Sequence, residues 1–128
     1  MIVAGIGCRR GAPAAAIEAV IAAALTRAGL DKSALSLIAA PAVKCDEPGI
    51  AATACARGVA LVAVSELELK GAGARAVTRS ERSFAHMGVP SVAEAAALAA
   101  AGTTGRLLLS RLALGPATCA LATNGEPP

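Results

Sequence analysis

The sequence predicts a single α/β domain, with a mixed, mostly parallel sheet of about five strands, helices on both faces and a C-terminal antiparallel hairpin. Three observations lead to this fold. Short apolar runs alternate with alanine-rich, helix-forming segments through most of the chain. The last two apolar runs flank Gly115-Pro116, a pattern typical of a hairpin. The length of 128 residues suits one domain, expected over residues 1–124 with a disordered tail at 125–128.

The first two strands and the helix between them follow from apolar spacing and from the residues that end each element. An apolar run at residues 2–6 indicates a buried strand, and the following stretch, 14–28, has helical spacing and ends before Gly29. A second strand is expected at 35–40, where Pro41 stops it. This order of elements is typical of a parallel strand pair joined by a helix.

The middle of the chain continues the same alternation. A helix is expected over residues 48–57, ended by Gly58. The apolar run 59–64 indicates a strand of a sheet that is covered on both faces. Ser65 then caps a short helix, with Glu68 as its capping-box partner.

Two further helices are marked by their caps. Ser80 is expected to cap a helix that ends at Gly88, and Ser91 a longer one that ends at Gly102. Glu94 stands three residues after Ser91, as the box partner of that cap. Because capping accounts for Ser91 and Glu94, neither residue needs a functional explanation.

The composition limits the classes of partner. Phe84 is the single aromatic residue, so the core must be built from Leu, Val, Ile and Ala with helices close to their neighbours. A net charge of +3 and the lack of stacking residues argue against nucleic acid and suit a small anionic ligand. No run reaches the roughly 18 apolar residues that cross a bilayer, and the start lacks a secretion signal. We therefore expect a cytoplasmic protein with no membrane contact.

The cysteines give no metal pattern. Cys8, Cys45, Cys55 and Cys119 form no C-x-x-C pair, and His86 alone does not complete a zinc site with them. We expect reduced thiols, no metal and no cofactor, with most of the cysteines acting as small buried hydrophobes. Cys8 differs, because two arginines and a helix start beside it favour a lowered thiol pKa.

The stretch at the end of the first strand has features of an anion-binding site. Gly5, Gly7 and Gly11 allow a tight turn and close backbone approach by a ligand, and Arg9 and Arg10 lie between the last two. The positive end of the following helix points into this turn. The alternative is a tight turn with solvated arginines.

Two later polar stretches offer partners for this turn. If the first two strands are parallel, Lys44 and Glu47 after the second strand lie at the same sheet edge as the arginines. Alternatively, Asp46 and Glu47 only complement the helix start. Farther on, the stretch around Ser80 carries hydroxyl groups and a charge that suit carboxylates or phosphates: Thr78, Arg79, Ser80 and Ser83.

The glycine turn does not match the motifs of nucleotide-binding sites. Its spacing is G-x-G-x-x-x-G, one residue longer than the dinucleotide fingerprint, and Ala40-Pro41 stands where an acidic ribose contact is expected. The Lys-Ser/Thr ending of a P-loop is also missing. A phosphate-binding α/β domain of another kind stays open as an alternative.

Taken in order, three stretches resemble one family. Gly5-Ile-Gly-Cys-Arg-Arg-Gly11 resembles its opening motif, Lys44 with Glu47-Pro-Gly49 its middle motif, and Ser83-Phe84 followed by Gly88-Val-Pro-Ser-Val-Ala-Glu-Ala-Ala-Ala97 its third. The family comprises CobE proteins and the C-terminal domain of CbiG, from cobalamin (vitamin B12) biosynthesis. The resemblance covers nearly the whole chain, and three motifs in order are more specific than any one of them.

The resemblance implies binding of a precorrin- or hydrogenobyrinic-acid-type tetrapyrrole, as a carrier or accessory protein of the aerobic pathway beside other corrin-pathway enzymes. The guanidinium groups of arginines can form paired hydrogen bonds with the carboxylates on the rim of such a macrocycle, while apolar side chains contact its face. Where many relatives have a Lys-rich turn in the hairpin, this chain has Arg111 alone. The residues expected to contact the ligand are Gly7, Cys8, Arg9, Arg10, Gly11, Lys44, Glu47, Arg79, Ser80, Ser83 and Arg111.

A hydrolase is the alternative function. CbiG-type proteins open a ring lactone of a cobalt-precorrin and release acetaldehyde. The resemblance covers the C-terminal domain of CbiG and not the N-terminal region that accompanies it, so we do not expect the activity to carry over directly. In a hydrolase, Glu47 would activate water, and Lys44 or Arg9 would stabilise the oxyanion. Cys8 would otherwise act as the nucleophile.

Overall fold

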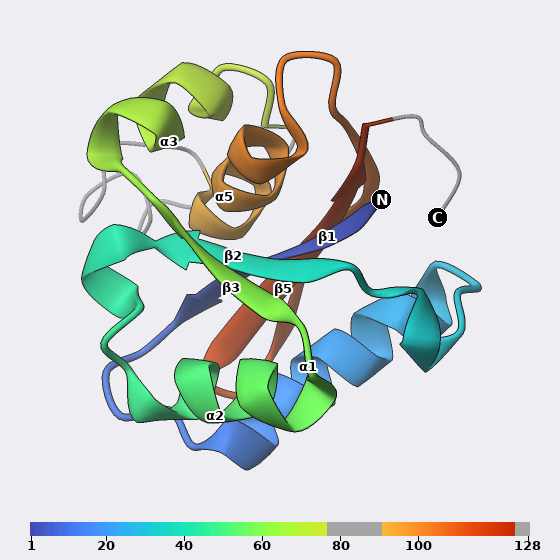
Figure 1. Cartoon of the computed structure of the whole chain (residues 1–128), viewed down its shortest axis with the longest axis vertical. Helices are drawn as coiled ribbons and strands as arrows, with labels where there is room; N and C mark the ends of the chain where they lie inside the picture. The colour runs from blue at the N-terminus through green and yellow to red at the C-terminus, as the bar shows by residue number, and fades with distance from the viewer. Residues whose placement is uncertain (77–90, 125–128) are drawn as a thin grey trace.

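A computed structural model describes residues 1–76 and 91–124, and one five-stranded sheet runs through the middle of them (Figure 1). The strand order across the sheet is β3-β2-β1-β5-β4. The expected α/β architecture with five strands is confirmed. The strands are β1 (Ile2–Cys8), β2 (Leu37–Pro41), β3 (Ala60–Val64), β4 (Arg106–Leu114) and β5 (Ala117–Thr123).

The sheet is mixed, but it is not mostly parallel as predicted. β2 pairs in parallel with both β1 and β3, whereas β5 is antiparallel to both β1 and β4. Among the described strands, parallel and antiparallel pairings are equal in number because the terminal hairpin supplies two of the five strands and pairs through β5 with β1. Two antiparallel pairings separate β4 from β1, so β1 to β4 all end at one edge. We call this the carboxyl edge.

Helices cover both faces of the sheet, as the sequence predicts. α1 (Ala14–Arg27) and α2 (Pro48–Arg57) pack on one face, and α3 (Glu66–Gly73) and α5 (Val92–Ala101) lie together on the other (Figure 1). The bounds of α2 are those predicted, since Pro48 occupies its first position and Gly58 ends it at a φ of +67°. Among the described helices, none is long and apolar enough to cross a bilayer.

The cap residues behave as expected where the structure describes them. Ser65 Oγ accepts from the Glu68 N–H, and Glu68 Oε1 accepts from the Ser65 N–H, both at 3.1 Å. This reciprocal pair is the capping box predicted for α3. The helix predicted between Ser80 and Gly88 and the tail at 125–128 lie outside the described residues.

β3 forms where the apolar run predicts a strand, in a sheet whose two faces are both covered by helices. It is the edge strand of that sheet, with Ala60 and Ala63 exposed and Leu61 half-buried. An apolar run indicates that part of a strand is buried. It does not report whether a neighbour pairs with each side of that strand, which depends on the order of the whole sheet.

α5 lies very close to the sheet because a glycine of β1 lies beneath it. A Cβ atom added at Gly5 would stand 2.0 Å from the Ala93 carbonyl oxygen and 2.6 Å from the Ala97 nitrogen. Residues 93–98 are all buried, and most of them are alanine. Gly5 therefore serves helix packing and not the ligand approach that we expected of it. Small residues allow the backbones to approach closely here, so large aromatic side chains are not needed to fill the core.

Gly5→Ala should destabilise the fold by about 3 kcal/mol, because the new methyl group would overlap the backbone of α5. Urea unfolding of the purified protein measures this change. Gly71→Ala is the matched control, since Gly71 lies inside α3 and a Cβ there meets nothing within 4 Å. The control should gain about 0.5–1 kcal/mol. Equal stability of the two variants would contradict the close packing of α5.

Candidate functional site

The carboxyl edge collects the loops that carry the predicted cations. Arg9 and Arg10 follow β1 directly and are exposed, and Lys44 lies in the short 3-10 turn Ala42–Lys44 that follows β2. The parallel pairing of β1 with β2 puts these three side chains at one edge, as predicted from the sequence. Within the part of the chain that the structure describes, no hydrogen bond or ion pair engages these side chains. The edge therefore presents cations to solvent.

The glycine turn holds a carboxylate of the chain itself. The Gly11 N–H donates to Glu47 Oε1 over 2.6 Å, and Gly11 adopts a φ of +78° that favours glycine. A Cβ on Gly49 would lie 2.3 Å from the Ala12 carbonyl oxygen, so α2 begins directly against the start of α1. Glu47 and Gly49 thus join the middle motif of the sequence to the opening one.

The arginine loop is also tied on its other side. The Arg9 N–H donates to the Pro116 carbonyl in the hairpin turn at 2.9 Å, and the Ala12 N–H donates to the Arg9 carbonyl at 3.1 Å. With the Gly11 N–H bound to Glu47, the backbone of this loop is fixed at three points while its arginine side chains stay exposed. A fixed loop loses little further entropy when its side chains bind a ligand.

Glu47 therefore has a structural role that the sequence did not reveal. We expected it either to activate water or to complement the start of α2, but it makes no side-chain cap on that helix. The bond to Gly11 spans 36 positions in the chain and has no local sequence signal. As a general base, Glu47 would have to act with one oxygen already accepting from Gly11.

The lowered thiol pKa expected for Cys8 is wrong. Burial raises the pKa of the half-buried Cys8 thiol, the positive charge of Lys44 opposes this, and the negative charge of Glu47 adds to it. These influences also mean that Cys8, Lys44 and Glu47 lie near one another. A thiol with a raised pKa is mostly protonated at neutral pH, which argues against Cys8 as an activated nucleophile.

Arg111 belongs to a different part of the sheet. It lies on β4, where the pairing with β5 shifts in register between Leu109 and Leu112. Its N–H donates to Oε2 of Glu94, on α5, at 2.8 Å. β1 and β5 separate β4 from β2, so Arg111 lies apart from Lys44. The structure brings together the cations of the first two loops but does not bring Arg111 among them.

Glu94 does more than cap α5. The N–H of Glu94 donates to Ser91 Oγ at 3.3 Å, as the cap pattern predicts. Its carboxylate, however, is fully buried and holds the irregular point of β4 through the Arg111 N–H. The capping pattern explained the residue so well in the sequence that this second role was missed. The available signal was a charged residue inside an otherwise apolar helix.

The remaining predicted contacts, Arg79, Ser80 and Ser83, lie outside the described residues, as do Thr78 and His86. α5 begins just after them, and its start lies beside the end of β1, since a Cβ on Gly7 would stand 3.7 Å from a methyl group of Val92.

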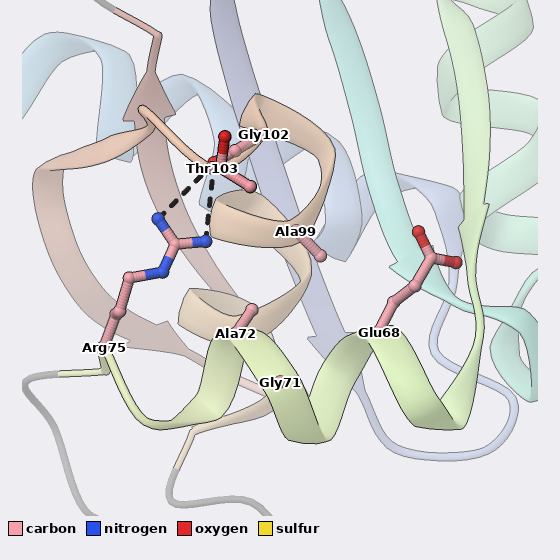
Figure 2. A pocket seen from close by; sticks show the side chains of 7 residues that line it. All are labelled: Glu68, Gly71, Ala72, Arg75, Ala99, Gly102 and Thr103. Atoms are coloured by element: carbon pink, nitrogen blue, oxygen red, sulfur yellow. Dashed lines mark hydrogen bonds between the residues drawn. The ribbon is translucent and has the colours of Figure 1, made fainter.

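A groove between α3 and α5 lies away from the carboxyl edge (Figure 2). The Arg75 guanidinium reaches over the end of α5 and donates to the carbonyl groups of Gly102 and Gly105, at 3.4 and 3.0 Å. These bonds satisfy carbonyl groups at a helix C-terminus, so Arg75 stabilises the fold. The groove is lined by Glu68, Gly71, Ala72, Arg75, Ala99, Gly102 and Thr103.

Comparisons with known proteins agree on one family. The family model described as cobalamin synthesis G C-terminus matches residues 2–122. A protein named CobE from a Sinorhizobium species is 35% identical over 121 residues, which cover 94% of this chain and 79% of that protein.

Two solved structures are similar in fold and sequence. The crystal structure of CobE, described as a protein from the cobalamin biosynthetic pathway, superposes with a TM-score of 0.89 at 32% identity, covering 95% of this chain and 89% of that one. The cobalamin biosynthesis protein chiG from Agrobacterium tumefaciens gives a TM-score of 0.79 at 40% identity, covering 98% of this chain and 100% of that one.

Glu94→Ala should lower the free energy of unfolding by about 2–4 kcal/mol, because the partly buried Arg111 N–H loses its acceptor. Glu94→Gln keeps one carbonyl oxygen and should lose less. Urea unfolding measures both. Glu66→Ala is the control, since it removes only an exposed ion pair to Lys70, and should change stability by no more than about 0.5 kcal/mol. An alanine variant at position 94 as stable as the control would rule out this role for Glu94.

Proposed function

Because this chain belongs to the cobalamin synthesis G C-terminal family, we propose that it binds a precorrin- or hydrogenobyrinic-acid-type tetrapyrrole at its carboxyl edge. It would act there as a carrier or accessory protein of corrin synthesis. The observation that carries the proposal is the parallel pairing of β1 with β2, which puts Arg9, Arg10 and Lys44 at one edge.

The charge chemistry supports this ligand class. A precorrin carries acetate and propionate carboxylates around its rim, and the guanidinium fork binds a carboxylate through two parallel hydrogen bonds. Arg9 and Arg10 are exposed on a loop whose backbone is held by Pro116 and Glu47. Their side chains need not leave any partner among the described residues in order to meet a ligand.

The chemistry of the neighbouring groups favours binding over catalysis. The pKa of the Cys8 thiol is raised, so the thiolate needed for nucleophilic attack is scarce at neutral pH. The Glu47 carboxylate already accepts from the Gly11 N–H. Glu47 therefore has a structural explanation, and Cys8 lacks the thiolate that a lactone hydrolase would need.

Titration with hydrogenobyrinic acid, followed by absorbance at low and moderate salt, tests the proposal. The wild-type protein should bind, and the double variant Arg9→Ala with Arg10→Ala should bind roughly 10- to 100-fold more weakly and with less salt dependence. The matched control is Arg27→Ala with Arg106→Ala, which removes the same charge from exposed positions that end α1 and begin β4, at the opposite edge. The control should bind as the wild type does.

Two results would contradict the proposal. Absence of binding by the wild type would remove it, and equal weakening in both double variants would show only a response to net charge. Release of acetaldehyde from a lactone-bearing precorrin, lost in Glu47→Gln, would support the hydrolase in its place.

A further inference from the structure

The chain leaves the ends of β2 and β3 toward opposite faces of the sheet. After β2 it enters α2, on the face that carries α1, and after β3 it enters α3, on the face that carries α5 (Figure 1). In open α/β sheets, ligands bind outside the carboxyl ends of the strands. The loops that begin after Pro41 and Val64 are two of the loops at that edge.

Exposed apolar side chains stand in these two loops. Val43 is 71% exposed, two residues after β2 ends, and Leu67 is 83% exposed, three residues after β3 ends. Leu114, at the end of β4, is the other large hydrophobic residue that is exposed among the described ones, at 46%. Folding of the described core does not require Val43 or Leu67, because neither packs into it.

The charges beside this pair suit an anionic partner. Lys44 follows Val43 directly, and Arg9 and Arg10 follow β1, which is the neighbour of β2 in the sheet. The acidic neighbours of Leu67 are engaged, since Glu66 pairs with Lys70 at 3.0 Å and Glu68 accepts from the Ser65 N–H. An apolar surface bordered by available cations matches a flat, apolar ring with carboxylates on its rim.

We infer that Val43 and Leu67 form an apolar platform for the ring face of the tetrapyrrole, while Arg9, Arg10 and Lys44 bind its rim carboxylates. This inference rests on the proposed function and names the part of the site that recognises the macrocycle itself. Cations alone would hold any small polycarboxylate. The platform makes the site selective for one with a large apolar ring.

The test compares Val43→Ser with Leu67→Ser, singly and together, against Leu114→Ser as the matched control. All three side chains are exposed, so the variants should fold and melt as the wild type does. In titrations with hydrogenobyrinic acid, each single variant at the platform should bind about tenfold more weakly and the double variant more weakly still, with the salt dependence of the wild type. Leu114 lies at the same edge but is separated from the platform by β1 and β5, and Leu114→Ser should change affinity by less than about twofold.

Each outcome separates this inference from the proposed function. If the wild type binds and the platform variants bind equally well, the inferred platform is wrong, while the proposed binding of the rim carboxylates is unaffected. If the wild type does not bind hydrogenobyrinic acid, both fail. If the platform variants keep their affinity but abolish a concentration-dependent dimer in sedimentation, the patch contacts a second copy of the chain, and the inference is overturned.

Discussion

The close approach of α5 to β1 at Gly5 is the constraint on which the rest of the structure depends. A core with almost no aromatic side chains must bring its backbones together, and Gly5 with the alanines of α5 allows this. The approach sets the start of α5 beside Gly7 at the carboxyl edge and buries Glu94 where it meets β4. Packing of small residues thereby determines where the polar groups of this half of the molecule can lie.

The other half of the edge depends on one hydrogen bond between two motifs. Glu47 accepts from the Gly11 N–H, and Gly49 lets α2 begin against Ala12. Most of what the sequence suggests as an anion-binding turn is thus satisfied from within the chain. What remains for an outside partner is the side chains of Arg9 and Arg10. The site is better described as exposed cations on a fixed loop than as a backbone cradle for an anion.

The sequence predicted where the helices and strands lie along the chain better than it predicted which strands pair in the sheet. Local signals such as Pro48 and Gly58 located α2, and Ser65 with Glu68 located the start of α3. The edge position of β3 and the attachment of β5 to β1 depend on the order of the sheet, which no local pattern records. In the site, parallel pairing of the first two strands brought the predicted cations to one edge. The pKa of Cys8 was mispredicted because the burial of its thiol, which a sequence does not show, outweighs nearby charge.

Amide chemical shifts test most directly whether the carboxyl edge binds a carboxylated macrocycle. A ¹⁵N–¹H spectrum of the labelled protein, recorded while hydrogenobyrinic acid is added, reports where contact occurs. We expect saturable shifts at Arg9, Arg10 and Lys44, with unchanged amide shifts at Arg27 and Arg106 on the opposite edge. Shifts confined to that opposite edge, or to the groove between α3 and α5 in Figure 2, would contradict this expectation.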